Sequence, residues 1–145
     1  MKGSVSIIGA ALVLAQAALA DMPDIAEGEV LYAENCASCH GAELQGQPDW
    51  RVPGPDGRLP APPHDETGHT WHHSDRVLFG YTKLGGKGFL AQQGIEFDSG
   101  MPGFGDQLSD QQIRNILAYI RSTWPDRALR VQAERSKVDM ENGDN

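Results

Sequence analysis

The stretch Cys36-Ala37-Ser38-Cys39-His40 decides how this chain is interpreted. Cys36 and Cys39 are its only cysteines, and His40 follows the second one directly. Two thiols at this spacing, followed by histidine, are typical of c-type haem attachment: the thiols add to the two vinyl groups of one haem, and the imidazole binds the iron. The motif therefore predicts one covalently bound haem c, with His40 as the proximal iron ligand. A thioredoxin-like redox pair is the alternative, but the βαβ pattern that it requires is missing.

The N-terminus has the features of an export signal. Lys2 precedes an apolar run that ends in Ala18-Leu19-Ala20, with small residues where signal peptidases require them. We predict a signal peptide over residues 1–20, cleavage after Ala20 and a periplasmic protein. The alternative is an uncleaved membrane anchor, although the run is short for a span of about 20 apolar residues. Membrane association would otherwise be only indirect.

The expected mature chain begins at Asp21, is acidic and has the length of one domain. Without Lys2 it carries 11 basic and 20 acidic side chains, a net charge of −9. Such a charge argues against nucleic-acid binding and favours protein partners with basic docking surfaces. Aromatic residues make up only 7% of the sequence, so a buried cofactor would supply apolar volume that the side chains lack.

Helical periodicity and capping signals recur along the chain, with long irregular segments between them. They predict helices over Asp24–Ala37, from Ser74 to the pair Gly85-Gly86, from Ser109 to Trp124, and a polar one over Asp126–Lys137 packed through Leu129 and Val131. Residues 41–73 and 87–100 are expected to be loops, and the first is long enough to wrap around a prosthetic group. Met140–Asn145 is expected to be a frayed tail.

These elements predict an all-α fold of about three to five helices, with long irregular loops around a covalent haem. The predicted organisation is a signal peptide over residues 1–20, one domain over 21–125 and a polar C-terminal extension over 126–145.

Met101 is the best candidate for the second axial ligand of the haem iron. Electron-transfer cytochromes usually use methionine there, and its thioether raises the reduction potential relative to a second histidine. Met22 and Met140 lie in terminal segments, whereas Met101 precedes Pro102 in a glycine-rich turn between two predicted helices. A methionine that merely fills the core is the alternative.

At this point the sequence resembles the class I monohaem cytochromes c. The resemblance extends from Glu27 to Trp124 and rests on three blocks: Gly28-x-x-x-Tyr32 before Cys36-Ala37-Ser38-Cys39-His40-Gly41, Met101-Pro102-x-Phe104, and Leu117-x-Tyr119-Ile120 through Trp124. It implies a mostly helical fold around haem c, with Cys36 and Cys39 covalently attached, His40 proximal and Met101 distal. It also implies that an aromatic residue of the last helix packs across Gly28, as the family's does.

The resemblance and the lack of other catalytic groups favour an electron carrier between a protein donor and a protein acceptor, and not an enzyme. A haem enzyme or gas-binding protein, with an open sixth iron site, is the alternative.

The chain departs from the simplest family pattern between Pro60 and Ser74, where four histidines crowd together: His64, His69, His72 and His73. One of them could replace Met101 as an axial ligand. Together they could bind copper or zinc, metals that suit imidazole, and make the chain a metal-handling accessory cytochrome. In the version that we favour, His69 and Trp71 lie beside the haem and hydrogen-bond its propionates, while His72 and His73 cap the next helix.

Two arginines of the wrapping loop are further candidates for the haem pocket. Arg51 and Arg58, with Trp50 beside them, could pair with haem propionates, because a guanidinium group binds a carboxylate through two parallel hydrogen bonds. An ordinary surface position for both is the alternative.

Overall fold

The computed structural model describes residues 22–143, and the signal peptide predicted over residues 1–20 lies outside them. Within residues 22–143 all regular secondary structure is helical, which confirms the predicted all-α fold. The α-helices are α2 (Ile25–Asn35), α3 (Ala37–His40), α4 (Asp75–Ala91), α5 (Asp110–Ser122) and α6 (Asp126–Gly143), and a short 3-10 helix, η1, spans Thr70–His72. None of these helices has the length and apolar character needed to cross a membrane.

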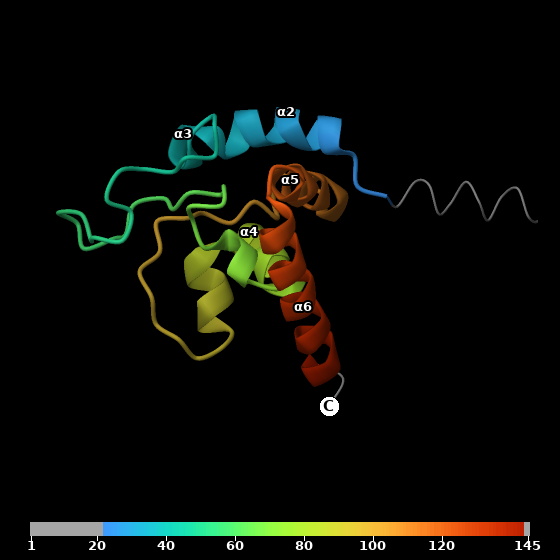
Figure 1. The fold of residues 1–145 in the computed structure, drawn as a ribbon. Coiled ribbons are helices and arrows are strands. Elements are labelled where there is room, and N and C mark those ends of the chain that lie inside the picture. Colours follow the sequence, from blue (N-terminus) through green and yellow to red (C-terminus); the bar gives the residue numbers. More distant parts are fainter. Residues whose placement is uncertain (1–21, 144–145) are drawn as a thin grey trace, which may run out of the picture.

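Helix α2 crosses α5 at a glycine, and Figure 1 shows α2 lying over the coil of α5. A Cβ atom on Gly28 would overlap the carbonyl oxygen of Asn115 and lie 3.1 Å from the Cβ of Tyr119. Only glycine lets the two backbones approach this closely. The buried Asn115 side chain also joins the helices, because its Oδ1 accepts a hydrogen bond from the Asp24 N–H at 3.0 Å and its Nδ2 donates to Glu27 at 2.6 Å. The predicted packing of an aromatic residue across Gly28 is confirmed.

The hydrophobic core lies beneath this crossing and is built mainly from one face of α5. Its most buried side chains include Leu31, Tyr32, Leu44, Leu108, Ile113, Ile116, Ile120 and Trp124. Helix α5 begins with the predicted capping box: Ser109 Oγ accepts from the Gln112 N–H at 3.2 Å, and Gln112 Oε1 accepts from the Ser109 N–H at 3.0 Å. These bonds satisfy backbone donors that the first turn of a helix leaves free.

Helix α4 runs further than the sequence predicts. Gly85, at φ +74°, interrupts the helix where a stop was expected, but a second helical piece follows and continues to Ala91. The prediction that the loop begins at residue 87 is therefore wrong. Burial of Phe89, which is 7% exposed and whose ring centroid lies 5.9 Å from that of Tyr81, favours the helical continuation.

Helix α6 is also longer than predicted, because it continues to Gly143. The prediction of a frayed tail starting at Met140 is thus wrong for residues 140–143. Residues 144–145 lie outside the part of the chain that the structure describes. The buried positions of α6 are Ala128, Gln132 and Ser136, four residues apart on one helix face. The predicted contacts, Leu129 and Val131, are only half-buried.

Side chains of α6 complete the N-terminus of α4. Ser136 Oγ accepts a hydrogen bond from the Asp75 N–H at 2.9 Å, and Gln132 Nε2 donates to the Asp75 carboxylate at 2.8 Å. Asp139 accepts two hydrogen bonds from the Arg76 guanidinium, at 2.7 and 2.9 Å. The C-terminal extension is therefore a packed element of the fold.

Candidate functional site

The two cysteines and His40 share a single helical turn at the end of α2. The N–H groups of Cys39 and His40 both donate to the Cys36 carbonyl, at 3.1 and 2.9 Å. Both thiols are free, with Cys36 buried and Cys39 exposed. Burial, together with the charge of Cys39, raises the pKa of the Cys36 thiol to about 11. This turn thus offers two thiols and an imidazole to one ligand.

A carbonyl group from the long loop holds His40. The Nδ1 atom of His40 lies 2.8 Å from the Pro62 oxygen. A carbonyl can only accept, so Nδ1 carries the proton and Nε2 keeps its lone pair. Burial lowers the pKa of the His40 imidazole, while the hydrogen bond to Pro62 acts in the opposite direction. A neutral imidazole with a free Nε2 is the form that binds a metal.

His64 packs directly on the His40 imidazole. The two rings are stacked, with centroids 4.0 Å apart and planes inclined by 22°. Tyr32 meets the His64 ring edge-on, at 6.3 Å between centroids. The structure therefore separates His64 from the other three histidines of its segment and brings it to the Cys36–His40 turn.

Two of those other histidines pack against tryptophans, and the third packs against one of the two. His69 stacks on Trp50, with ring centroids 5.2 Å apart, and His73 meets His69 edge-on at 5.3 Å. His72 lies perpendicular to Trp71 at 3.8 Å. Within residues 22–143 no group of three or more His, Cys, Asp or Glu side chains is arranged to hold a metal ion. The described residues thus give no support to the hypothesis of a copper or zinc site.

The prediction that His72 and His73 cap helix α4 is wrong. Ser74, and neither His72 nor His73, caps α4, with its Oγ accepting a hydrogen bond from the Val77 N–H at 3.3 Å. A short side chain with an oxygen acceptor reaches the free backbone donors of the first turn, and Ser74 supplies one. Trp71 is half-buried, packs against the core and donates from Nε1 to the Glu66 carbonyl at 3.2 Å.

The two candidate arginines differ in their partners. The Arg51 guanidinium lies 4.0 Å above the Trp50 ring, beside the stack of Trp50 on His69. Arg58 instead donates to both carboxylate oxygens of Asp98, at 2.9 and 3.1 Å. Arg58 therefore already has a carboxylate partner, and Arg51 is the better candidate for the haem pocket.

Backbone contacts with the break in α4 fix Met101. The Gly86 N–H donates to the Met101 carbonyl at 3.2 Å, and the Met101 N–H donates to Ser99 Oγ at 3.2 Å. A Cβ atom on Gly85 would lie 2.9 Å from the Met101 oxygen, so the glycine lets this turn approach the helix. The Met101 side chain is half-buried. Within residues 22–143 no hydrogen bond joins Met101 to the Cys36–His40 turn.

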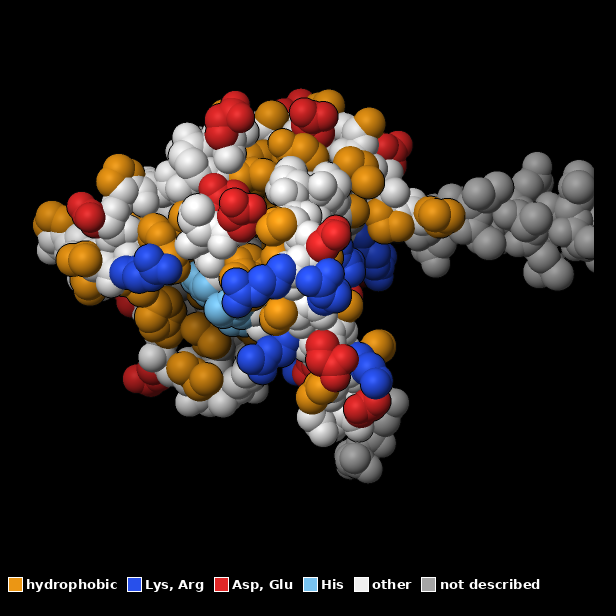
Figure 2. All heavy atoms as spheres, in the orientation of Figure 1, with side chains coloured by type: hydrophobic (Ala, Val, Ile, Leu, Met, Phe, Trp, Pro, Cys, Tyr) orange, Lys and Arg blue, Asp and Glu red, His pale blue; other side chains and the backbone are white. Residues whose placement is uncertain are grey.

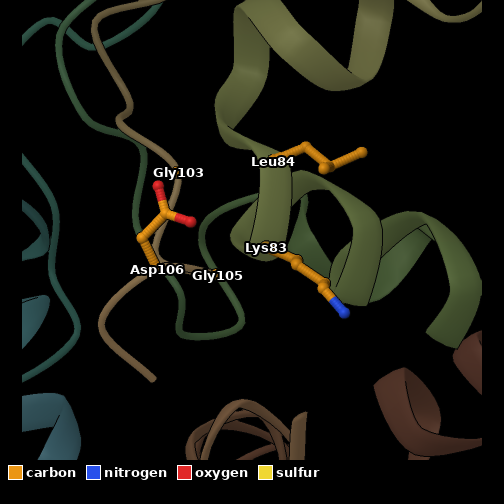
Figure 3. A pocket seen from close by; sticks show the side chains of 5 residues that line it. All are labelled: Lys83, Leu84, Gly103, Gly105 and Asp106. Atoms are coloured by element: carbon orange, nitrogen blue, oxygen red, sulfur yellow. The ribbon is translucent and has the colours of Figure 1, made fainter. Parts of the chain in front are cut away.

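The same turn borders a pocket at the middle of α4, shown in Figure 3. It is lined by Lys83, Leu84, Gly103, Gly105 and Asp106. The side chains of Lys83 and Leu84 point away from Asp106, and Lys83 forms an ion pair with Asp110 at 2.7 Å. None of the candidate site residues lines this pocket.

Charges are unevenly distributed along the chain and over the surface. Residues 22–50 contain no Lys or Arg but six acidic residues: Asp24, Glu27, Glu29, Glu34, Glu43 and Asp49. Figure 2 shows acidic groups over α2, while Lys and Arg side chains surround the histidines below it. The segment that carries the cysteines is therefore acidic.

Three observations test whether a covalent haem fits these residues, and all three agree with it. Two free thiols and a neutral imidazole lie on one turn. A thioether, that of Met101, is held half-buried by the backbone of α4. The Nδ1 atom of His69 is buried without a hydrogen-bond partner among the described residues, and a haem propionate would satisfy it.

Sequence reasoning missed the residues that hold His40 in place. Pro62 acts through its carbonyl, and because every residue has a carbonyl, no sequence signal identifies it. His64 was noted only as an alternative ligand, because its stacking on His40 depends on the path of the loop. The turn residues Pro60, Pro62 and Pro63 indicated only that this loop bends.

Comparison with known proteins agrees with the geometry. A family model described as Cytochrome c matches residues 25–124. The match includes the Cys36–His40 turn, the histidine segment and Met101, and it ends at Trp124, before α6 begins. No curated protein and no solved structure matches the chain.

Proposed function

Because the chain belongs to the cytochrome c family and binds one haem c covalently, we propose that it carries single electrons between a protein donor and a protein acceptor. Cys36 and Cys39 would form the thioether bonds, and His40 and Met101 would bind the iron. When bound, the haem supplies a metal centre that takes up and releases one electron. The observation that carries the proposal is the turn with two free thiols and an unprotonated His40 Nε2.

The surroundings of the two axial donors suit an electron carrier. The Pro62 carbonyl holds the His40 ring, and hydrogen bonds with Gly86 and Ser99 hold the Met101 backbone. Donors fixed in this way move little when the charge of the iron changes, which favours rapid electron transfer. An enzyme or gas-binding protein would instead need one iron position left open. His69 and Arg51 would provide donors for the haem propionates.

We propose the periplasm as the site of action and partners with basic docking surfaces. The signal peptide predicted over residues 1–20 supports the location. The acidic segment 22–50, which includes the exposed Cys39, supports docking by a basic partner near the haem attachment.

Replacing Met101 tests the proposed ligation. Met101→Ala should abolish the sulfur-to-iron charge-transfer band of the oxidised protein, because alanine offers no sulfur donor. Met140→Ala is the matched control, since Met140 is 66% exposed at the far end of α6, and it should leave the band unchanged. Absorption spectroscopy of the purified proteins measures both. A band that survives in Met101→Ala would overturn the distal assignment and favour an open or bis-His site.

A further inference from the structure

We infer that His64 is a positioning residue for His40, and that its ring fixes the orientation of the His40 imidazole against the haem iron. The inference rests on the proposed function, in which His40 is the proximal ligand. Its basis is the stack of the two rings, with centroids 4.0 Å apart and planes inclined by 22°. His40 belongs to the turn after α2 and His64 to the long loop, so the stack joins two separate segments.

Two different restraints act on the His40 ring. The ring turns about its Cβ–Cγ bond, and the hydrogen bond from Nδ1 to the Pro62 carbonyl, at 2.8 Å, opposes this turn at one edge of the ring. The flat contact with His64 opposes the same turn across the face of the ring. Together the two contacts define the plane of the imidazole. For an axial ligand, that plane sets how its π orbitals overlap with the iron d orbitals, so neighbours of the ligand influence the electronic state of the iron.

His64 is itself held firmly enough to act as such a guide. Its backbone N–H donates to the Leu44 carbonyl at 2.8 Å, and its backbone carbonyl accepts from Trp124 Nε1 at 2.7 Å. Its Nδ1 lies 2.8 Å from Thr70 Oγ1, and Thr70 is only 6% exposed. These contacts tie His64 to the end of α5, to η1 and to the loop after the haem-binding turn. The first two contacts fix the backbone of residue 64, and the contact with Thr70 fixes its imidazole, which a side chain that only filled space would not need.

The stack also distinguishes this role from that of an axial ligand. Two ligands on opposite faces of one iron have the porphyrin plane between them. Rings in contact at 4.0 Å leave no room for that plane. The geometry therefore assigns His64 to the proximal side, behind His40.

The test uses the full-length protein with haem attached and two variants of one residue. His64→Leu removes the flat ring, and His64→Phe keeps a ring but loses the hydrogen bond to Thr70. Electron paramagnetic resonance of the oxidised protein reports the orientation of an axial imidazole through the position and width of its low-field signal. We expect His64→Leu to shift and broaden this signal, and His64→Phe to stay close to the parent protein.

Two results would overturn the inference. One is a parent-like signal in His64→Leu. The other is a signal in His64→Phe displaced as far as in His64→Leu, because the flat ring would then not be the feature that orients His40. Should His64→Leu fail to retain haem, His64→Met decides, since it also lacks the flat ring. A shifted and broadened signal in His64→Met supports the inference, and a parent-like one rejects it.

The same samples separate failure of the inference from failure of the proposed function. The charge-transfer band reports on Met101, on the opposite side of the iron. If the parent protein lacks that band, the proposed distal ligand is wrong. The dependence of the resonance signal on residue 64 would still test the role of His64 at His40.

Discussion

Gly28 lies where α2 crosses α5, and a methyl group on it would overlap the Asn115 carbonyl oxygen. We expect Gly28→Ala to lower the free energy of unfolding by about 1–3 kcal/mol, because the helices would have to move apart. Gly88 offers a matched control, since it is an exposed glycine of α4 whose added Cβ would meet only the Leu84 Cβ, at 3.6 Å. Gly88→Ala should stabilise the protein by up to about 1 kcal/mol. Chemical denaturation measures both, and equal losses would contradict the close-approach explanation.

His73 should make the stability of the protein depend on pH. Burial, followed by the charges of His72 and Arg135, lowers the pKa of His73 from its usual value of 6.5. The unfolded chain therefore binds this proton more readily, and the free energy of unfolding decreases as the pH falls below about 6.5. His73→Gln removes this titration and should reduce the dependence between about pH 7 and pH 5, while His64 and His69, whose pKa values burial also lowers, account for what remains.

Denaturation curves at several pH values check this expectation. Asp98 and Asp139 do not interfere, because hydrogen bonds from arginine lower their pKa values from 3.8, and their contribution is lost only at more acidic pH. An identical slope in the parent protein and in His73→Gln would show that other groups govern this pH range.

For single residues, the sequence identified the side chains that bind the haem better than it identified the groups that surround them. The residues Cys36, Cys39 and His40 could be named because covalent attachment demands that spacing. The partners of His40 could not be named, since Pro62 contributes only a backbone oxygen and His64 only a flat face. Met101 could be proposed as an iron ligand because it lies in a glycine-rich turn. Its hydrogen bond with Gly86 depends on the break in α4, and the pair Gly85-Gly86 predicted only the end of that helix.

At the level of elements, helix α6 lies outside the residues that match the family and yet packs on the rest of the chain. Its Ala128 is 3% exposed, and its Gln132 and Ser136 bind the first residue of α4. Deleting residues 126–145 should therefore leave the haem covalently attached but lower the midpoint of thermal unfolding by on the order of 10 °C. Ending the chain after Met140 is the control, because residues 141–143 are exposed. Similar midpoints for the two truncations would contradict a structural role for α6.

The helix boundaries that side-chain caps determine were predicted well. Those that depend on the burial of side chains were predicted poorly. Ser74 and Ser109 begin their helices as predicted, because each hydroxyl accepts a backbone N–H. The ends of α4 and α6 were placed too early. Glycines and polar residues suggested a stop there, but the burial of Phe89 and the contacts of Asp139 favour continuation.

For the whole molecule, charge should control how fast redox partners are met. The chain has a net charge of −8, and its cysteine-bearing segment, residues 22–50, has no basic residue. We expect electron exchange with a small cationic complex to slow as salt is added, and exchange with a small anionic complex to accelerate. Stopped-flow measurements at several salt concentrations test this. Salt dependences of the same sign for both complexes would contradict electrostatic steering at the acidic face.

The crossing of α2 and α5 has a consequence for the order of events during biosynthesis. The hydrogen bond between Asp24 and Asn115 joins residues 91 positions apart. If the proposed export begins at the N-terminus, both cysteines reach the periplasm well before the helix that completes their enclosure. Until residue 115 follows, the thiol of Cys36 has no closed core around it. The late arrival of α5 thus leaves an interval in which the attachment turn is still open to the machinery that joins it to haem.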